Sequence, residues 1–261
     1  TLTTPDEYQR SEIPSGGIEQ LIFAPQGVLA APEARRAVAH CIPRDLIAGN
    51  AGVPIANSRL NTVAEDAYSV LETGPLSDQY NLANPDAARE ALQGEPLTMR
   101  VGYQSPNPRL AAAVAAITGS CAAAGVTVID VTADGVGPQT LRDGQIDALL
   151  ASTGGASGSG STGSSAMDDY TLHAGNGNNL SGYNNPQVDG IIAALAVTTD
   201  PKEQARLLGD AAPLLWEDMP TLPLYRQQRT VISTKKMFGV EANPTKWGAG
   251  WNMDRWRLEP E

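Results

Sequence analysis

Few residues in this sequence are suited to catalysis, and they are scattered. The two histidines, His40 and His173, lie far apart, and no G-x-S-x-G segment occurs in the chain. A hydrolase of that kind needs its serine on such a strand-to-helix turn, within reach of a histidine base. Asp168 and Asp169 are adjacent, but calcium loops need oxygen ligands at regular alternating positions. The sequence therefore predicts a protein without catalytic activity, and with neither a metal nor a cofactor.

A low-complexity run occupies residues 154–165, which contain only Gly, Ser, Ala and Thr. Gly158, Gly160 and Gly163 in this run formally match the G-x-G-x-x-G dinucleotide motif. That motif needs a tight turn between a strand and an apolar helix, and here no apolar helix follows. The match is therefore attributed to composition. Two interpretations of the run stay open: a natural mobile loop at the mouth of a cleft, or an engineered replacement for a deleted segment.

The two cysteines, Cys41 and Cys121, each fall on the apolar face of a helical pattern. One interpretation is that both are small buried hydrophobic residues. The other is that they form a disulfide between two packed helices, which is plausible in an exported protein. Their spacing does not match that of a zinc site.

Composition excludes several classes of partner. The chain has 261 residues, with 18 Lys and Arg against 29 Asp and Glu, which gives a net charge of -11. Such a charge argues against nucleic-acid binding and against docking on an anionic membrane surface. No apolar run approaches the roughly 18 to 20 residues that span a bilayer. Residues 1–5 do not read as a signal peptide, so we expect a mature chain or part of a longer one.

Strands and helices are predicted to alternate along the chain. Strands are expected at residues 18–24, 97–103, 126–131, 146–152 and 222–225. Helices are expected after Pro32, Pro43, Pro85 and Pro201, and at residues 108–124, 139–143 and 187–197. This order implies parallel strands with right-handed crossovers, and hence an α/β fold. Ligands bind beyond the carboxyl ends of the strands in such sheets, which here means after Tyr103 and Ser152.

Two segments carry a resemblance to a known family. The stretch from Tyr183 to Tyr225 opens with Y-N-N-P and closes with W-E-D-M-P-T-L-P-L-Y, and residues 34–47 read A-R-R-A-V-A-H-C-I-P-R-D-L-I. In this order they resemble the C-terminal half of family-5 extracytoplasmic solute-binding proteins, the oligopeptide and dipeptide receptors of ABC importers. The resemblance implies the C-terminal lobe of a periplasmic-binding-protein-like type II fold, with a parallel or mixed sheet flanked by helices.

The same resemblance implies a domain organisation and a function. Residues 1–24 would come from the N-terminal lobe and hinge, 25–225 would form the C-terminal α/β lobe, and 226–261 would return to the N-terminal lobe. The protein would be extracytoplasmic and non-catalytic, and would capture a peptide or small-molecule ligand for an ABC permease. Its membrane contact would be a lipid anchor on the N-terminus of the parent protein.

Seven residues are expected to bind the ligand. They are Thr153, Gly154, Ser181, Tyr183, Asn184, Trp247 and Trp251. The two tryptophans have a second interpretation, in which they pack the tail onto the N-terminal lobe. Asn185 and Pro186 are interpreted as the start of a helix.

One feature departs from the peptide receptors of this family. Those proteins typically place an acidic residue after the strand that matches residues 146–152, whereas no Asp or Glu occurs here before Asp168. In this respect, and in its cysteines, the chain resembles actinobacterial lipoproteins of the mycobacterial LpqW kind. That likeness implies an alternative function, the regulation of cell-envelope glycolipid synthesis (phosphatidylinositol mannoside and lipoarabinomannan). Its partner would then be an envelope-biosynthesis membrane protein, and it would have no transport role.

Overall fold

A mixed five-stranded sheet forms the centre of the structure. The computed structural model describes residues 5–59, 74–152, 172–241 and 249–259. The strand order is β3-β2-β4-β1-β5. The strands are β1 (Tyr8–Phe23), β2 (Leu97–Gly102), β3 (Val126–Asp130), β4 (Ala148–Ser152) and β5 (Thr221–Thr234). β2 runs parallel to β3 and β4, which confirms the predicted parallel pairing, whereas β1 runs antiparallel to β4 and β5.

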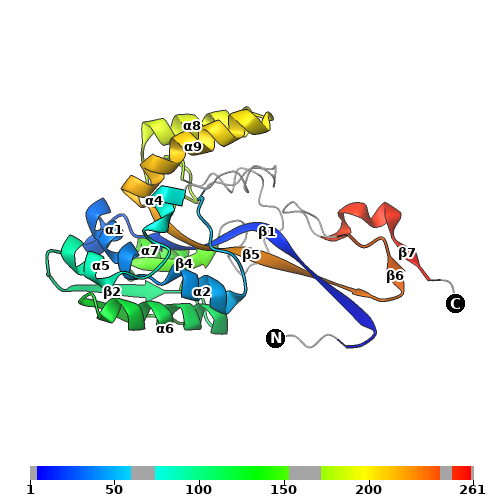
Figure 1. Cartoon of the computed structure of the whole chain (residues 1–261), viewed down its shortest axis with the longest axis horizontal. Helices are drawn as coiled ribbons and strands as arrows, with labels where there is room; N and C mark the ends of the chain where they lie inside the picture. Colours follow the sequence, from blue (N-terminus) through cyan, green and yellow to red (C-terminus); the bar gives the residue numbers. More distant parts are fainter. Residues whose placement is uncertain (1–4, 60–73, 153–171, 242–248, 260–261) are drawn as a thin grey trace.

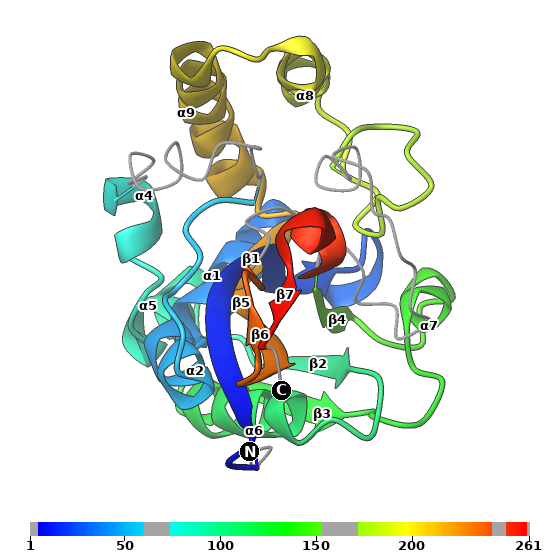
Figure 2. The same ribbon diagram turned by 90° about the vertical axis from the view of Figure 1, so that its right-hand side faces the viewer.

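The helices surround this sheet. They are α1 (Pro32–Cys41), α2 (Arg44–Ala51), α4 (Gly74–Asp78), α5 (Pro85–Ala91), α6 (Pro108–Ala122), α7 (Pro138–Arg142), α8 (Pro186–Val197) and α9 (Pro201–Asp218). Figures 1 and 2 show α6 at one end of the lobe and the α8–α9 pair at the other. None of the helices in the described ranges is long and apolar enough to cross a membrane.

Helix starts follow from local chemistry. Asn84, Asn107, Asn185 and Asp200 each precede a proline, and each accepts a hydrogen bond on its side-chain oxygen from a backbone N–H of the first turn. The first backbone N–H groups of a helix have no acceptor within the helix, and the capping side chain supplies one. Proline is tolerated at the first helical position because an N–H there would make no bond within the helix. The predicted cap at Asn185 is confirmed.

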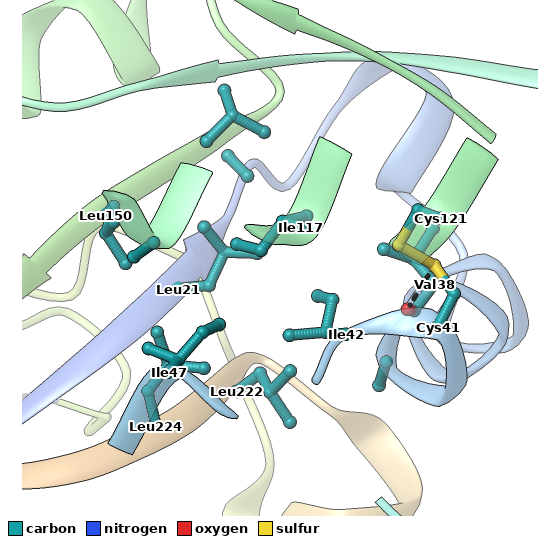
Figure 3. Packing of buried hydrophobic residues seen from close by; sticks show 14 of the residues in the cluster. Leu21, Val38, Cys41, Ile42, Ile47, Ile117, Cys121, Leu150, Leu222 and Leu224 are labelled. Carbon is teal, nitrogen blue, oxygen red and sulfur yellow. Dashed lines mark hydrogen bonds between the residues drawn. A yellow bond between two sulfur atoms is a disulfide. The ribbon is translucent and has the colours of Figure 1, made fainter. Parts of the chain in front are cut away.

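Alternating residues of the central strands fill cores on both faces of the sheet. Leu21 on β1 is opposite Leu150 on β4, and both are buried in the main core under α1, α2 and α6 (Figure 3). Ile22 is opposite Leu149, and these side chains face a smaller core that contains Leu141 of α7. Successive side chains of a strand point to opposite faces, so a sheet covered on both sides needs apolar residues at consecutive positions.

A disulfide joins α1 to α6 in the main core. The sulfur atoms of Cys41 and Cys121 are 1.98 Å apart, and both residues are fully buried (Figure 3). The disulfide interpretation of these two cysteines is therefore confirmed. The bond connects positions 80 residues apart in the sequence, so it restrains a large part of the lobe.

β1 and β5 are much longer than predicted. Their pairing begins at Tyr8 and Thr234, far from the helices, and continues to Ile22 and Thr221 inside the lobe. The outer part forms a two-stranded ribbon that leaves the lobe and leads toward β6 (Met237–Phe238) and β7 (Arg257–Leu258), as Figure 1 shows. Sequence patterns indicated only the inner part, because the outer residues are rich in polar side chains and are held by backbone pairing rather than by an apolar core.

The α8–α9 pair has a small core of its own. Val188, Ile192 and Leu195 of α8 pack against Leu208 and Leu215 of α9. The apolar spacing along both helices places these side chains on facing stripes. The pair is tied to the lobe at the last turn of α9, where the backbone carbonyl of Asp218 accepts hydrogen bonds from Arg35.

Candidate functional site

The carboxyl edge of the sheet lies on the side where the β1–β5 ribbon leaves the lobe. β4 ends at Ser152, and the register pairs this residue with Glu19 of β1. β1 is antiparallel to β4, so residues of β1 before Glu19 continue outward beyond the end of β4 (Figure 1). Open α/β sheets bind ligands beyond this edge. The polar side chains gathered here are therefore the best candidates for a site.

Glu19 is the buried centre of this group. Its relative exposure is 2%. Its Oε2 accepts a hydrogen bond from Gln227 Nε2 at 3.2 Å and lies 3.5 Å from Arg109 Nη2. Burial raises the pKa of Glu19 because it disfavours the charged carboxylate, and the positive charge of Arg109 partly opposes that shift. A carboxylate in this setting is held by its neighbours and is shielded from solvent.

Arg109 and Tyr225 complete the group, which we call the edge cluster: Glu19, Arg109, Tyr225 and Gln227. Arg109 is the second residue of α6, directly after the turn that follows β2, and its side chain is half exposed. Its guanidinium carbon lies 5.7 Å from the ring centre of Tyr225, which is buried beside Glu19 on β5. Burial raises the pKa of the Tyr225 hydroxyl, so this group stays neutral. The cluster thus exposes the positive charge of Arg109 above the buried side chains of Glu19 and Tyr225.

A second polar group lies at the base of α9 and is mainly structural. Arg44 and Arg59 are buried, and their guanidinium carbons lie 5.4 and 4.2 Å from the Trp216 ring. Tyr80 stacks on the same indole at 5.4 Å. Arg59 Nε donates to the carbonyl oxygen of Thr221 at 2.8 Å. Burial lowers the pKa of each arginine to about 9, and at neutral pH both remain charged. Carbonyl groups and aromatic faces stabilise these charges.

The structure places the predicted residues near α8 away from the edge cluster. Tyr183 is buried, and its hydroxyl donates to Asp218 Oδ2 at 2.6 Å. Gly182 lies against Pro25, which follows β1 at the amino end of β4. Tyr183 is therefore at the opposite end of β4 from Ser152. Ligand contact by Tyr183 stays a prediction, and its contacts here are those of a packing residue.

The other predicted ligand residues fall into two groups. Ser181 is buried and donates to Asn179 Oδ1 at 2.9 Å, whereas Asn184 is exposed. Of the remaining four, Thr153, Gly154 and Trp247 lie outside the described residues, as does the side chain of Trp251. The Gly/Ser run at residues 154–165 and the pair Asp168 and Asp169 lie there too.

The histidines show no catalytic arrangement in the described residues. His40 packs against Tyr80 with ring centres 4.6 Å apart, and burial lowers its pKa. His173 Nδ1 lies 2.7 Å from the carbonyl oxygen of Ala174. Within the same ranges, no three His, Cys, Asp or Glu side chains come close enough together to hold a metal ion.

Sequence reasoning missed all four residues of the edge cluster. Glu19 carries a usable signal, since it is the single charged residue of a predicted strand that is mostly apolar, and such a buried charge needs a partner. Arg109 also stands at an informative place, in the first turn of a helix after a strand. Their proximity depends on strand order: β1, β4 and β5 are adjacent although residues 19, 152 and 225 are distant in sequence.

The sequence is similar to mycobacterial lipoproteins, and no family model matches it. It is 64% identical over 99% of its length to the uncharacterized lipoprotein Rv2585c of Mycobacterium tuberculosis, and 61% identical to ML0489 of Mycobacterium leprae. The chain spans about half of these relatives, 46% and 47% of their lengths. A stretch of 66 residues, 25% of the chain, is 34% identical to the glutathione-binding protein GsiB of Salmonella typhimurium and covers 13% of it.

Solved structures share the architecture. The periplasmic EDTA-binding protein EppA matches 98% of the chain with a TM-score of 0.79 and 17% identity, over 51% of its own length. The oligopeptide-binding protein AppA of Bacillus subtilis, solved with a nonapeptide, matches 98% with a TM-score of 0.73 and 12% identity, over 53% of its length. The chain has a type II periplasmic-binding-protein fold. The predicted fold class is thereby confirmed.

A third structure with the type II fold binds a metal complex. NikZ of Campylobacter jejuni, solved with Ni(L-His), matches 97% of the chain with a TM-score of 0.73 and 15% identity, over 54% of its length. EppA and AppA are named for the solutes that they bind, NikZ was solved with one, and at these identities the likeness concerns the fold alone.

Proposed function

We propose that the chain is the C-terminal lobe of an extracytoplasmic solute-binding lipoprotein, which captures a peptide-like or other small polar ligand for an ABC importer. The observation that carries this proposal is the edge cluster: a half-exposed Arg109 over the buried Glu19, at the carboxyl edge of the sheet. The cluster lies where β1 and β5 leave the lobe, and a second lobe joined through these strands would face it.

The names of similar proteins support the class of function. GsiB is named for glutathione, AppA was solved with a nonapeptide, and NikZ with a nickel–histidine complex. The mycobacterial relatives are named lipoproteins, which supports a lipid anchor and an extracytoplasmic location for the parent protein. None of these names describes an enzyme, and this supports the proposal of a binding protein.

The proposed mechanism is hinge closure. β1 and β5 would be the strands that cross between the lobes, so that residues 1–24 and 226–261 lie in or near the N-terminal lobe and 25–225 form the lobe described above. A ligand in contact with both lobes stabilises the closed state in proportion to its extra affinity for that state. The permease would then distinguish closed from open protein.

Native mass spectrometry of the full two-lobed parent, purified gently from a mycobacterial host, tests this proposal. We expect a retained small molecule that is released on denaturation and identified by its mass. Membrane vesicles that contain the partner permease should accumulate that molecule only when the binding protein is present. A protein that carries no small molecule, and binds none from a peptide and metabolite panel, would contradict the proposal.

A second function is favoured by one observation, the absence of an acidic residue after β4. Residues 153–167 contain no Asp or Glu, and this is where peptide receptors of the resembled family hold the ligand ammonium group. An LpqW-like regulator of phosphatidylinositol mannoside and lipoarabinomannan synthesis would not need that anchor. Deletion of the gene distinguishes the two functions: a regulator alters the glycolipid profile and leaves solute uptake unchanged, whereas a receptor does the reverse.

A further inference from the structure

We infer that Arg109 contacts the ligand directly and that the ligand carries an anionic group, a carboxylate or a phosphate. This inference rests on the proposed function, because it names the ligand class of that same site. Peptide receptors of the resembled family typically place an acidic residue after the strand that matches β4. In this chain the accessible charge at this edge of the sheet is instead the cation of Arg109.

Of the two charged residues in the edge cluster, Glu19 and Arg109, only Arg109 is accessible to a ligand. The side chain of Glu19 is 3% exposed, whereas that of Arg109 is 49% exposed. Glu19 also lies on the same side of the sheet as the buried Leu21, two residues further along β1. An incoming ligand therefore reaches the guanidinium first, and the carboxylate remains beneath it.

The positive charge of Arg109 is only partly compensated. Its contact with Glu19, 3.5 Å between Nη2 and Oε2, is long for a charged hydrogen bond. The same carboxylate oxygen accepts a shorter bond from Gln227, at 3.2 Å. The Arg109 guanidinium has several N–H donors, and its side chain is 49% exposed. Donors on the exposed side therefore remain for a ligand.

The position of Arg109 adds to its suitability for an anion. It lies in the first turn of α6, a helix of 15 residues whose N-terminal end carries a partial positive charge. Tyr225 lies beside the guanidinium and restricts the space it can occupy. A planar guanidinium held in this way matches the two oxygens of a carboxylate or phosphate.

The test uses the full two-lobed protein from a mycobacterial host in four forms: wild type, Arg109→Gln, Arg109→Lys and Arg206→Gln. Arg206 is an exposed arginine on α9, paired with Glu203 and Asp210, and serves as the matched control. Native mass spectrometry gives the occupancy and identity of the retained molecule. Titrations with reduced glutathione, inorganic phosphate and phosphatidylinositol–phosphatidylcholine vesicles distinguish a peptide carboxylate, free phosphate and a lipid headgroup.

We expect the wild type and Arg206→Gln to retain an anionic molecule, and Arg109→Gln to bind it at least about tenfold more weakly, the usual loss for one charged hydrogen-bond partner. Arg109→Lys should recover part of the affinity. Unchanged thermal unfolding shows that the variants fold. A neutral or cationic ligand, or an anionic one held equally well by Arg109→Gln, overturns the inference and leaves the proposed function intact. A protein that binds nothing overturns both.

Discussion

Arg44 Nε donates a hydrogen bond of 2.7 Å to the backbone carbonyl oxygen of Pro223. The two residues belong to the two segments that carry the family resemblance in the sequence, residues 34–47 and the end of the stretch that closes at Tyr225. Arg35 forms a second link, from Nη2 to the carbonyl oxygen of Asp218 at 2.6 Å. The two motifs are therefore one packing unit, in which arginines of the first hold the helix end and strand of the second.

Replacement of Arg44 by methionine should destabilise the lobe by roughly 3 kcal/mol. The arginine is fully buried and donates to Pro223, Ala56 and Asn81, so its loss leaves buried oxygen acceptors without donors. Urea unfolding followed by tryptophan fluorescence measures the change in unfolding free energy. Arg206→Met removes an exposed arginine of the same size and should change stability by no more than about 0.5 kcal/mol. Equal effects of the two changes would show that burial of Arg44 is unimportant.

The Cys41–Cys121 disulfide should contribute about 4 kcal/mol to stability, because it closes a long loop in the unfolded chain. The double variant Cys41→Ala/Cys121→Ala should unfold at a correspondingly lower urea concentration. Dithiothreitol should lower the stability of the wild type toward that of the variant, and should leave the variant itself unaffected. If the reductant shifted both proteins equally, the bond would not be the cause.

The core of the fold could be predicted from the sequence, whereas the ribbon could not. Within the lobe, the β-branched strand at residues 126–131 and the Asn–Pro pair at Asn185 carry local signals, and each appears in the structure within a few residues of its expected place. The outer parts of β1 and β5 are stabilised by each other across more than 200 residues, since Tyr8 pairs with Thr234. A pairing of that kind leaves no local pattern to detect.

The candidate site was hidden for a related reason. The family resemblance points to the position directly after Ser152, where peptide receptors typically carry an acid. The structure places Glu19 opposite Ser152 through the antiparallel pairing of β1 with β4, and places Arg109 of α6 beside it. The residues of this cluster are distant in sequence and are brought together by the strand order β4-β1-β5.

Two glycines should respond in opposite ways to alanine. A Cβ at Gly102, the last residue of β2, would lie 2.7 Å from Val136 Cγ1 and 3.1 Å from Ile146 Cδ1. Gly102→Ala should therefore cost about 1 to 3 kcal/mol through overpacking. Gly119 lies within α6 with open space around its Cα, and Gly119→Ala should stabilise the helix by up to about 1 kcal/mol. Thermal unfolding of both variants gives the signs, and a stabilised Gly102→Ala would contradict the close packing of Val136 and Ile146 around Gly102.

His40 should make the lobe less stable in mild acid. Burial lowers its pKa below the unfolded value of about 6.5, so below that pH the unfolded chain binds a proton more readily than the folded one. The unfolding free energy then falls as pH drops from about 7 to about 5. His40→Gln should show a smaller fall than the wild type in urea titrations over this range. Parallel curves for the two proteins would show that His40 does not titrate differently on folding.

Glu19 should make the lobe less stable as the pH rises, which is the opposite of the effect of His40. Burial raises its pKa above the unfolded value, so the folded state keeps a proton at pH values where the unfolded chain has lost it. Stability from this group is therefore fully present below the unfolded pKa and declines as pH rises through the folded pKa. Glu19→Gln removes the titration. The difference in unfolding free energy between Glu19→Gln and the wild type should grow in favour of the variant as the pH rises above the unfolded pKa of about 4.5.

Replacement of Arg109 tests the pH dependence of stability that is attributed to Glu19, because the positive charge of Arg109 counteracts the rise in the pKa of Glu19. In Arg109→Gln the Glu19 carboxylate loses the nearby positive charge, so its pKa should rise further. The loss of unfolding free energy with rising pH should then continue to a higher pH. The double variant Arg109→Gln/Glu19→Gln should lose the additional decline. If Arg109→Gln changed stability by the same amount at every pH, with or without Glu19, the two side chains would not be electrostatically coupled, and Arg109 would not be held over a buried carboxylate at the edge of the sheet.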